Sequence, residues 1–173
     1  MQLTERFDEA LSWARQLHTH QVRKGSGVPY LAHLLSVAAR VLETGGDEDQ
    51  AIAGLLHDAP EDCGGREILE QIERRFGPRV AGIVSACTDT FEEPKPPWRA
   101  RKERYIEHLV SDAPPEALLV SLADKVHNSG AILADYRAIG EELWSRFRGG
   151  KQGTLWYYRA LLDAYRQRPD APT

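Results

Sequence analysis

The sequence is poor in sulfur. Its 173 residues include two cysteines and one methionine, and the cysteines do not form a CxxC pair. A disulfide framework and a zinc ribbon both need more cysteines at closer spacing, so neither is expected. We expect Cys63 and Cys87 to be ordinary, partly buried thiols.

Long hydrophobic runs are also absent. The longest apolar stretches, residues 51–56 and 117–123, are much shorter than the ~20 residues that cross a bilayer. The first residues lack the basic segment followed by an apolar one that marks a secretory signal. We therefore expect a cytoplasmic protein that does not contact membranes.

The sequence has no excess of positive charge. Its 22 Lys and Arg residues and 26 Asp and Glu residues give a net charge of −4. Domains that coat nucleic acid carry a strongly basic face, so no nucleic-acid partner is expected. Hydrophobic residues make up 42% and charged residues 28%, which is the composition of a soluble globular protein with a core of its own.

Helical periodicity runs through the whole sequence. Asp47 with Gln50 three residues later is typical of a capping box at a helix start, and the proline-rich segment 92–97 predicts a loop. Because alternating β-branched runs are missing, the expected fold class is all-α. Apolar residues three and four positions apart predict helices over about 4–20, 29–45, 47–57, 66–76, 79–89, 98–111, 115–137, 140–147 and 153–167.

The clearest chemical signal is the run HDAPED that begins at His57. Asp58, Glu61 and Asp62 share one face of a helix and repel one another. A cation should neutralise them, and the neighbouring imidazole indicates a divalent ion such as manganese, iron or zinc. Pro60 should bend or end the helix. From these six residues alone, a solvated acidic helix end with His57 on the surface remains an alternative.

Two further residues favour the metal hypothesis. His33 lies on the preceding predicted helix, and Asp124 directly follows an apolar run. Alone, such a histidine is more typical of a hydrogen-bonded core residue, and such an aspartate of a salt-bridge partner. An unpaired carboxylate at the edge of a core is costly, however. The ordered set of His, His-Asp and a distant Asp on three predicted helices is hard to explain by chance.

The ordered set resembles that of the HD-domain metal-dependent phosphohydrolases, whose pattern is H…HD…D. The segment RKGSGVPY from Arg23 to Tyr30 is similar to the RK-SGEPY segment of the RelA/SpoT hydrolase domain, and HDAPED is similar to its HDxxED signature. The resemblance covers about residues 7–128. Further matches follow in the same order: Phe76-Gly77, Val80, Thr88-Asp89, Arg101-Lys102 and Ala123-Asp124-Lys125-Val126-His127-Asn128.

The resemblance implies one HD-domain helical bundle of about eight or more helices over residues 1–173, with residues 129–167 as its C-terminal helices. It also implies hydrolysis of ppGpp and pppGpp that releases the 3′-pyrophosphate and uses Mn²⁺ or another divalent transition metal. The chain is similar to a stand-alone small alarmone hydrolase, too short for a synthetase domain. The implied residues are His33, His57, Asp58 and Asp124 for the metal, Glu61 and Asp62 for catalysis, and Arg23, Lys24, Arg101, Lys102 and Asn128 for substrate.

The sequence departs from the family pattern at several positions. Val28 and Leu34 replace Glu and Pro, Gly25 is an extra loop residue, Pro60 is unusual within the HDxxED signature, and the segment after Asn128 diverges. Two alternatives therefore stay open beside a guanosine polyphosphate hydrolase. One is an HD phosphohydrolase for another nucleotide, and the other is a metal- or nucleotide-binding module without catalysis. The oligomeric state is also open.

Overall fold

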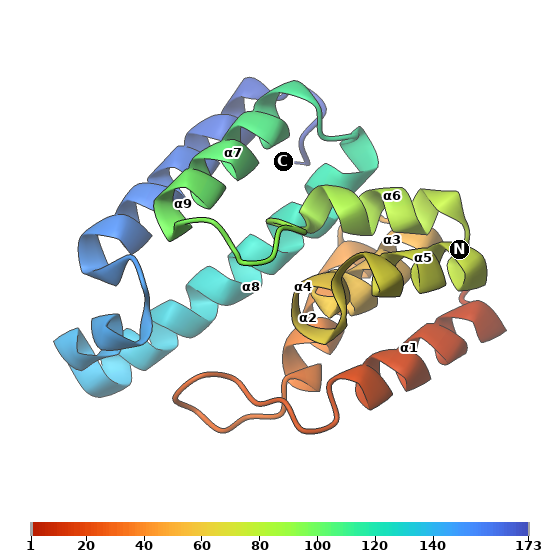
Figure 1. Cartoon of the computed structure of the whole chain (residues 1–173), viewed down its shortest axis with the longest axis horizontal. Coiled ribbons are helices and arrows are strands. Elements are labelled where there is room, and N and C mark those ends of the chain that lie inside the picture. Colours follow the sequence, from red (N-terminus) through yellow and green to blue (C-terminus); the bar gives the residue numbers. More distant parts are fainter. Residues whose placement is uncertain (1, 173) are drawn as a thin grey trace.

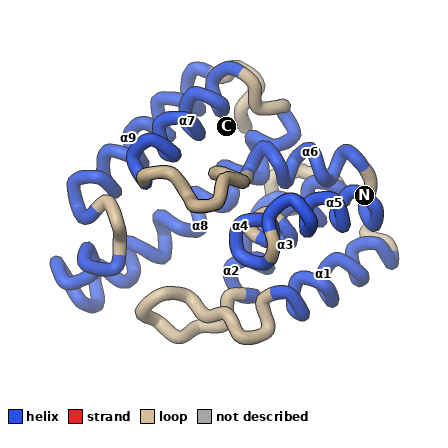
Figure 2. Tube along the Cα trace, in the orientation of Figure 1, coloured by secondary structure: helices blue, strands red, loops and turns tan. Residues whose placement is uncertain are grey.

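Residues 2–172 are described in the computed structural model, and they fold into helices joined by loops (Figures 1 and 2). Within these residues the only β-type pairing is an isolated bridge between Val22 and Pro29, so the predicted all-α fold is confirmed. The helices are α1 (Glu5–Leu17), α2 (Leu31–Glu43), α3 (Glu48–Leu56), α4 (Ala59–Cys63), α5 (Gly65–Phe76), α6 (Pro78–Cys87), α7 (Trp98–Ser111), α8 (Pro115–Ile139), the 3-10 helix η1 (Gly140–Arg146) and α9 (Gly150–Gln167).

The helix ends show how far local sequence determines the fold. The predicted capping box is present, with Asp47 Oδ1 accepting from Gln50 N and Gln50 Oε1 accepting from Asp47 N, both at 3.0 Å. The helix predicted from Pro29 begins later, at Leu31. Pro29 is paired with Val22, and Tyr30 N donates to Gln21 O (2.9 Å). These contacts hold the end of the α1–α2 loop in a hairpin and delay the helix.

The predicted helix break at Pro60 is confirmed. α3 ends at Leu56, and Asp58 is the N-cap of the short helix α4, with Pro60 in its first turn. A proline is tolerated there because the backbone N–H that it lacks has no partner within the helix. Asp62 N still donates to Asp58 O (3.1 Å), so the acidic residues stay together on one turn.

Two groups of buried side chains meet on α8, which crosses the middle of the molecule (Figure 1). The first packs α1–α6 against Ala117, Val120 and Ala123. The second packs α7 and α9 against Leu118. The first half of α8 is therefore enclosed on two sides, which explains why it carries an almost continuous apolar run up to Asp124.

Two expectations drawn from composition can be compared with the fold. Cys63 is half-buried and Cys87 is buried, and neither forms a disulfide, as predicted. Among residues 2–172, no helix combines the length and the apolar character that a bilayer span requires.

Candidate metal centre and adjoining cleft

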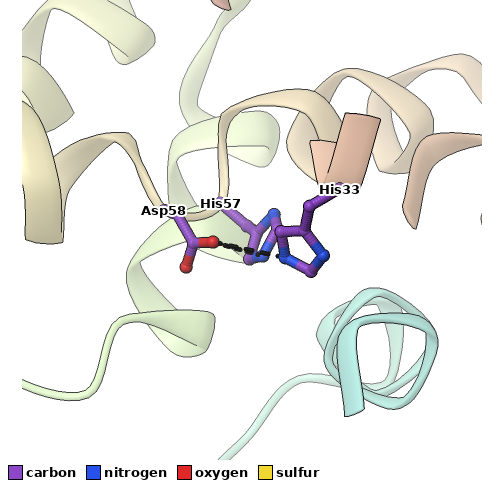
Figure 3. A group of neighbouring side chains, drawn as sticks. All are labelled: His33, His57 and Asp58. Atoms are coloured by element: carbon purple, nitrogen blue, oxygen red, sulfur yellow. Dashed lines mark ion pairs between the residues drawn. The ribbon is translucent and has the colours of Figure 1, made fainter. Parts of the chain in front are cut away.

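Four side chains from three helical segments converge at one point. His33 lies in the first turn of α2, His57 and Asp58 lie between α3 and α4, and Asp124 lies on α8. Asp58 Oδ2 is 3.4 Å from His33 Nε2 and 3.1 Å from His57 Nε2 (Figure 3). Asp124 Oδ1 is 3.2 Å and 3.7 Å from the same two nitrogens. The predicted set of four is thus assembled by the fold.

The chemistry of this cluster fits a divalent cation. His33, His57 and Asp58 each offer one ligand atom, and these three atoms lie within 4.8 Å of one another. The Nε2 atoms of His33 and His57 are buried and have no hydrogen-bond partner, although carboxylate oxygens lie nearby. Buried polar atoms are normally hydrogen-bonded. Two unpaired imidazole nitrogens facing two carboxylates are the ligand set that divalent transition metals prefer.

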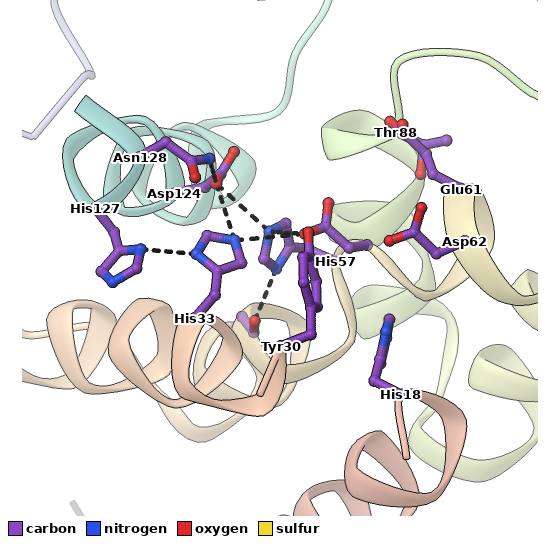
Figure 4. Close-up of polar contacts among 12 residues, drawn as sticks. His18, Tyr30, His33, His57, Glu61, Asp62, Thr88, Asp124, His127 and Asn128 are labelled. Atoms are coloured by element: carbon purple, nitrogen blue, oxygen red, sulfur yellow. Dashed lines mark hydrogen bonds and ion pairs between the residues drawn. The ribbon is translucent and has the colours of Figure 1, made fainter. Parts of the chain in front are cut away.

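Each member of the cluster is held by a neighbour (Figure 4). His57 Nδ1 lies 2.8 Å from Gly54 O, a carbonyl that can only accept, so this nitrogen carries the proton and leaves Nε2 free. His33 Nδ1 lies 2.8 Å from His127 Nδ1, and Tyr30 donates its hydroxyl proton to Asp58 Oδ2 (2.6 Å). Such outer contacts fix the orientation of metal-binding side chains.

Asp124 is held from the side of α8. Lys125 Nζ donates to its Oδ2 (2.6 Å), and the Asn128 amide donates to its Oδ1. Burial by itself raises the pKa of Asp124, but the Lys125 ammonium and the nearby imidazoles of His33 and His57 together lower that pKa well below its usual value. Asp124 in turn keeps the pKa of Lys125 high against the effect of burial. Both side chains are therefore charged.

A small polar chamber of about 170 Å³ adjoins the cluster. Glu61 lines this chamber, and its Oε1 accepts from Asp89 N (2.7 Å). Burial and the charge of Asp58 raise the pKa of Glu61, although Lys102 and other lysines oppose the rise. Four carboxylates and two ammonium groups line the chamber, so a bound divalent cation would balance its charge. These residues are Asp58, Glu61, Asp89, Asp124, Lys102 and Lys125.

The structure separates the two predicted catalytic acids. Asp62 is exposed and lines a second, larger cavity rather than the polar chamber. Its Oδ2 accepts from Gln21 Nε2 (2.7 Å). Glu61 and Asp62 therefore face different spaces, although they are neighbours in sequence.

The larger cavity is a cleft of about 670 Å³ between the α1–α2 loop and the C-terminal part of the chain. Five basic side chains and two acidic ones line it, so its charge is positive overall. It also carries several aromatic rings, which suits a flat ligand group. The charged residues are Arg23, Lys24, Lys102, Arg146, Arg148, Asp62 and Asp135, and the aromatic ones are Tyr30, Trp98, Phe147, Tyr157 and Tyr158.

Four of the five residues predicted to contact substrate line this cleft. Arg23, Lys24, Lys102 and Asn128 do so, and Arg23 Nη2 donates to Asn128 Oδ1 (2.7 Å). Arg101 lines neither cavity. It is buried, its guanidinium pairs with Asp89, and its Nε donates to Pro96 O (3.1 Å). Its contact with substrate stays a prediction.

Several residues of the two cavities were not assigned a role from sequence. Lys125 and His127 adjoin Asp124 in the matched motif, so their position there was the available signal. Tyr30 is the last residue of the matched loop segment, and its bond to Asp58 places it beside the cluster. Arg146 and Arg148 carried no signal, because their place in the cleft depends on contacts across the chain.

Comparison with known proteins agrees with this geometry. Residues 10–154 match the family described as HD domain. The chain is 38% identical over 143 residues to guanosine-3′,5′-bis(diphosphate) 3′-pyrophosphohydrolase MESH1 of Xenopus tropicalis, covering 81% of this chain and 74% of that protein. It is 35% identical over 127 residues to the guanosine-3′,5′-bis(diphosphate) 3′-pyrophosphohydrolase of Aquifex aeolicus. That match covers 73% of this chain but 18% of the relative, so the chain spans less than a fifth of its length.

Solved structures extend the match to the fold. A metazoan orthologue of SpoT that hydrolyses ppGpp has a TM-score of 0.69 with this structure, at 27% identity over 98% of both chains. The protein lmo0812 of Listeria monocytogenes has a TM-score of 0.66 at 31% identity, over 76% of this chain and 82% of that one. The predicted HD-type helical bundle is thus confirmed, and the family implies a divalent metal. The chain belongs to the HD-domain family.

Proposed function

We propose that this protein is a divalent-metal-dependent hydrolase that removes the 3′-pyrophosphate from ppGpp and pppGpp, leaving GDP or GTP. The observation that best supports this proposal is that the acidic chamber and the basic cleft adjoin each other and share lining residues. The acidic chamber suits a cation and a reacting phosphate, and the basic, aromatic cleft suits the rest of a nucleotide. Four residues line both cavities: Tyr30, Lys102, Asn128 and Tyr157. The names of the relatives in X. tropicalis and A. aeolicus support the same substrate.

The proposed metal ligands are His33, His57, Asp58 and Asp124, and the proposed ion is Mn²⁺ or another divalent transition metal. When bound, such an ion acidifies water and neutralises charge on phosphoryl oxygens. The residues around it set the ligand geometry, since Tyr30 and Asn128 each hold one carboxylate in place.

Glu61 is proposed as the base for the attacking water. Hydrolysis joins the water oxygen to the phosphorus next to the ribose 3′-oxygen, breaks the bond between that phosphorus and the 3′-oxygen, and releases pyrophosphate. Glu61 lines the chamber with the proposed ligands Asp58 and Asp124, and the N–H of Asp89 fixes its carboxylate. Its raised pKa makes it a better proton acceptor than an ordinary glutamate.

The other charged side chains of the two cavities can bind the phosphate groups and the nucleoside. Lys102 and Lys125 line the chamber and can bind the oxygens of the 3′-diphosphate and of the pyrophosphate product. Asp62 lines the cleft instead, on the side where the nucleoside would lie. We propose that Asp62 passes a proton from solvent water to the 3′-oxygen, which must be protonated when its bond to phosphorus breaks. Arg23, Lys24 and Asn128 are proposed to hold the nucleoside. We also propose that residues 1–173 form one domain, of which residues 1 and 173 lie outside the described part.

Product identification tests this proposal. The purified protein, after elemental analysis for its metal content, is incubated with Mn²⁺ and ppGpp, and the products are resolved by anion-exchange chromatography. We expect GDP and pyrophosphate in equal amounts, and a large loss of both with Glu61→Gln. Orthophosphate release, or hydrolysis of other nucleotides instead, would favour a different HD phosphohydrolase. Binding of ppGpp without any product would favour the non-catalytic alternative.

A further inference from the structure

The cleft is lined by two arginines from the C-terminal part of the chain, Arg146 at the end of η1 and Arg148 just after it. Arg146 Nη1 bonds to Asp135 Oδ2 (2.9 Å). Asp135 and Asp124 lie on the same helix, α8, with Asp135 eleven residues further along. At 1.5 Å per residue, this separation is about 16 Å along the helix axis. The cleft therefore has a cationic end that is distant from the proposed site of chemistry.

Arg146 is fixed on two sides. Asp135 binds it from α8, and the backbone of Gly25 packs against its guanidinium from the α1–α2 loop. Gly25 has φ +80°, and a Cβ atom added there would overlap the guanidinium of Arg146. The extra glycine of this loop thus allows a close approach, and a larger residue there would adopt a strained φ and push the Arg146 guanidinium aside. A side chain already held in place loses less entropy when it binds a ligand.

The Arg148 side chain has no contact like those that Asp135 and Gly25 make with Arg146 among the described residues. It is exposed and lines the same cleft. Within residues 2–172, its side chain forms neither a hydrogen bond nor an ion pair in the structure. An unpaired guanidinium on the wall of a basic cleft is suited to an anionic group of the ligand. Guanidinium groups bind phosphate oxygens with paired, charge-assisted hydrogen bonds.

We propose that Arg146 and Arg148 bind the 5′-phosphate groups of the nucleotide while its 3′-diphosphate lies in the acidic chamber. This inference rests on the proposed function and adds a specificity rule to it. The arginines and the acidic chamber are far apart, so one nucleotide reaches both only if it carries phosphate at both the 5′ and the 3′ positions of its ribose. The arginines then select such a nucleotide over one that carries phosphate at the 3′ position alone.

Two substrates that differ only in their 5′-phosphates test the rule. The wild type, Arg146→Ala, Arg148→Ala and Arg166→Ala are assayed with Mn²⁺ on ppGpp and on guanosine 3′-diphosphate, which has a free 5′-hydroxyl. Each cleft variant should raise the KM for ppGpp roughly tenfold or more, which corresponds to the loss of a charge-assisted hydrogen bond. The KM for guanosine 3′-diphosphate should change less than twofold. Arg166 is an exposed arginine of α9 outside the cleft, and its variant should match the wild type.

The outcomes separate this inference from the function on which it rests. Equal effects of the variants on both substrates would show that the arginines only support the fold, and would overturn the inference while leaving the hydrolase intact. Equal KM values of the wild type for the two substrates would do the same. A wild type that hydrolyses neither substrate would overturn the proposed function and the inference together. Arg148→Ala keeps the test valid if Arg146→Ala fails to fold, because no described contact depends on the Arg148 side chain.

Discussion

The rings of His33 and His127 face each other with their Nδ1 atoms 2.8 Å apart. His33 can offer Nε2 to a metal only if its own proton sits on Nδ1, which then donates to His127. His127 must accept through its Nδ1, so it is neutral and protonated on Nε2. Burial and the neighbouring His33 lower the pKa of His127 to about 4, which agrees with a neutral ring.

Replacing His127 should therefore weaken metal binding. His127→Phe removes the acceptor, and the loss of such an outer contact costs 10–100-fold in metal affinity. Titration with Mn²⁺ against a fluorescent chelator measures this affinity directly. His127→Asn offers a carbonyl oxygen in its place and should recover part of the loss. His20→Phe, at an exposed histidine, serves as the control. An unchanged affinity in His127→Phe would exclude this positioning role.

Metal binding should stabilise the folded protein. With Mn²⁺ at about 100 times its Kd, the gain in the free energy of unfolding is about 2.7 kcal/mol. The wild type should show a higher Tm with Mn²⁺ than after treatment with a chelator. Asp58→Asn should lose this difference, whereas Asp112→Asn, at an exposed helix end, should keep it. A full Mn²⁺ response in Asp58→Asn would remove Asp58 from the ligand set.

Glu61 and Asp62 should differ in their contribution to catalysis. Glu61 lines the chamber with the proposed ligands, whereas Asp62 is exposed in the cleft. Glu61→Gln should lower kcat by roughly 10²–10⁴-fold, the range of general base catalysis. Asp62→Asn should have a smaller effect on kcat. Steady-state kinetics on ppGpp compares the two, and a larger loss from Asp62→Asn would reverse the assignment of the base.

Lys102 should limit activity at high pH. Burial and the neighbouring Lys125 lower the pKa of Lys102 to about 8. A lysine is charged below its pKa, so its attraction for phosphate is lost as the pH rises through about 8. We expect kcat/KM to fall above this pH, and Lys102→Arg to shift the fall upward because arginine stays charged.

The control for this pH profile is Lys151→Arg. Lys151 forms an ion pair with Glu141 outside both cavities, and its variant should have the wild-type profile. Lys102→Ala should raise KM more than it lowers kcat, because binding of the phosphate in ground and transition states is lost alike. A high-pH limb that is identical in Lys102→Arg and the wild type would assign it to another group.

The capping box at the start of α3 should contribute to stability without affecting chemistry. Asp47→Ala removes the N-cap acceptor of Gln50 N and should lower the free energy of unfolding by about 1 kcal/mol. Asp47→Asn keeps the cap but loses the ion pair with Arg79 (2.7 Å), which is exposed and contributes little. Urea unfolding measures both, and kcat should be unchanged. A larger loss in Asp47→Asn than in Asp47→Ala would contradict the capping role.

The pH dependence of this contribution has a definite sign. The hydrogen bond from Arg79 lowers the pKa of Asp47 below its usual value, although burial acts in the opposite direction. A depressed carboxyl pKa stabilises the fold above the unfolded-state value of about 3.9. That contribution is lost as the pH falls through the lowered pKa. The difference between wild type and Asp47→Asn should therefore shrink in acid.

Sequence periodicity predicted the long helices because they depend on local spacing. The cluster of His33, His57, Asp58 and Asp124 was predicted instead from the order of these residues along the chain and from the family resemblance. The start of α2 was placed too early because the pairing of Pro29 with Val22 is a contact across the loop. Neighbouring acids look equivalent in a sequence, and the different cavities that Glu61 and Asp62 line are set by contacts with Asp89 and Gln21, which lie far from them in the chain. Arg146 reaches the cleft only because η1 packs near a loop more than a hundred residues earlier, and no local pattern records that.

α8 has different surroundings at its two ends. Its first half lies between two hydrophobic cores. Most substitutions there would therefore disturb the packing and displace Asp124, which follows this buried stretch. Toward its C-terminus, Leu133 and Tyr136 are exposed, and neither core restrains the sequence. Substitutions toward the C-terminus of this helix can therefore change which ligand binds without disturbing the packing that holds the proposed metal centre at the other end.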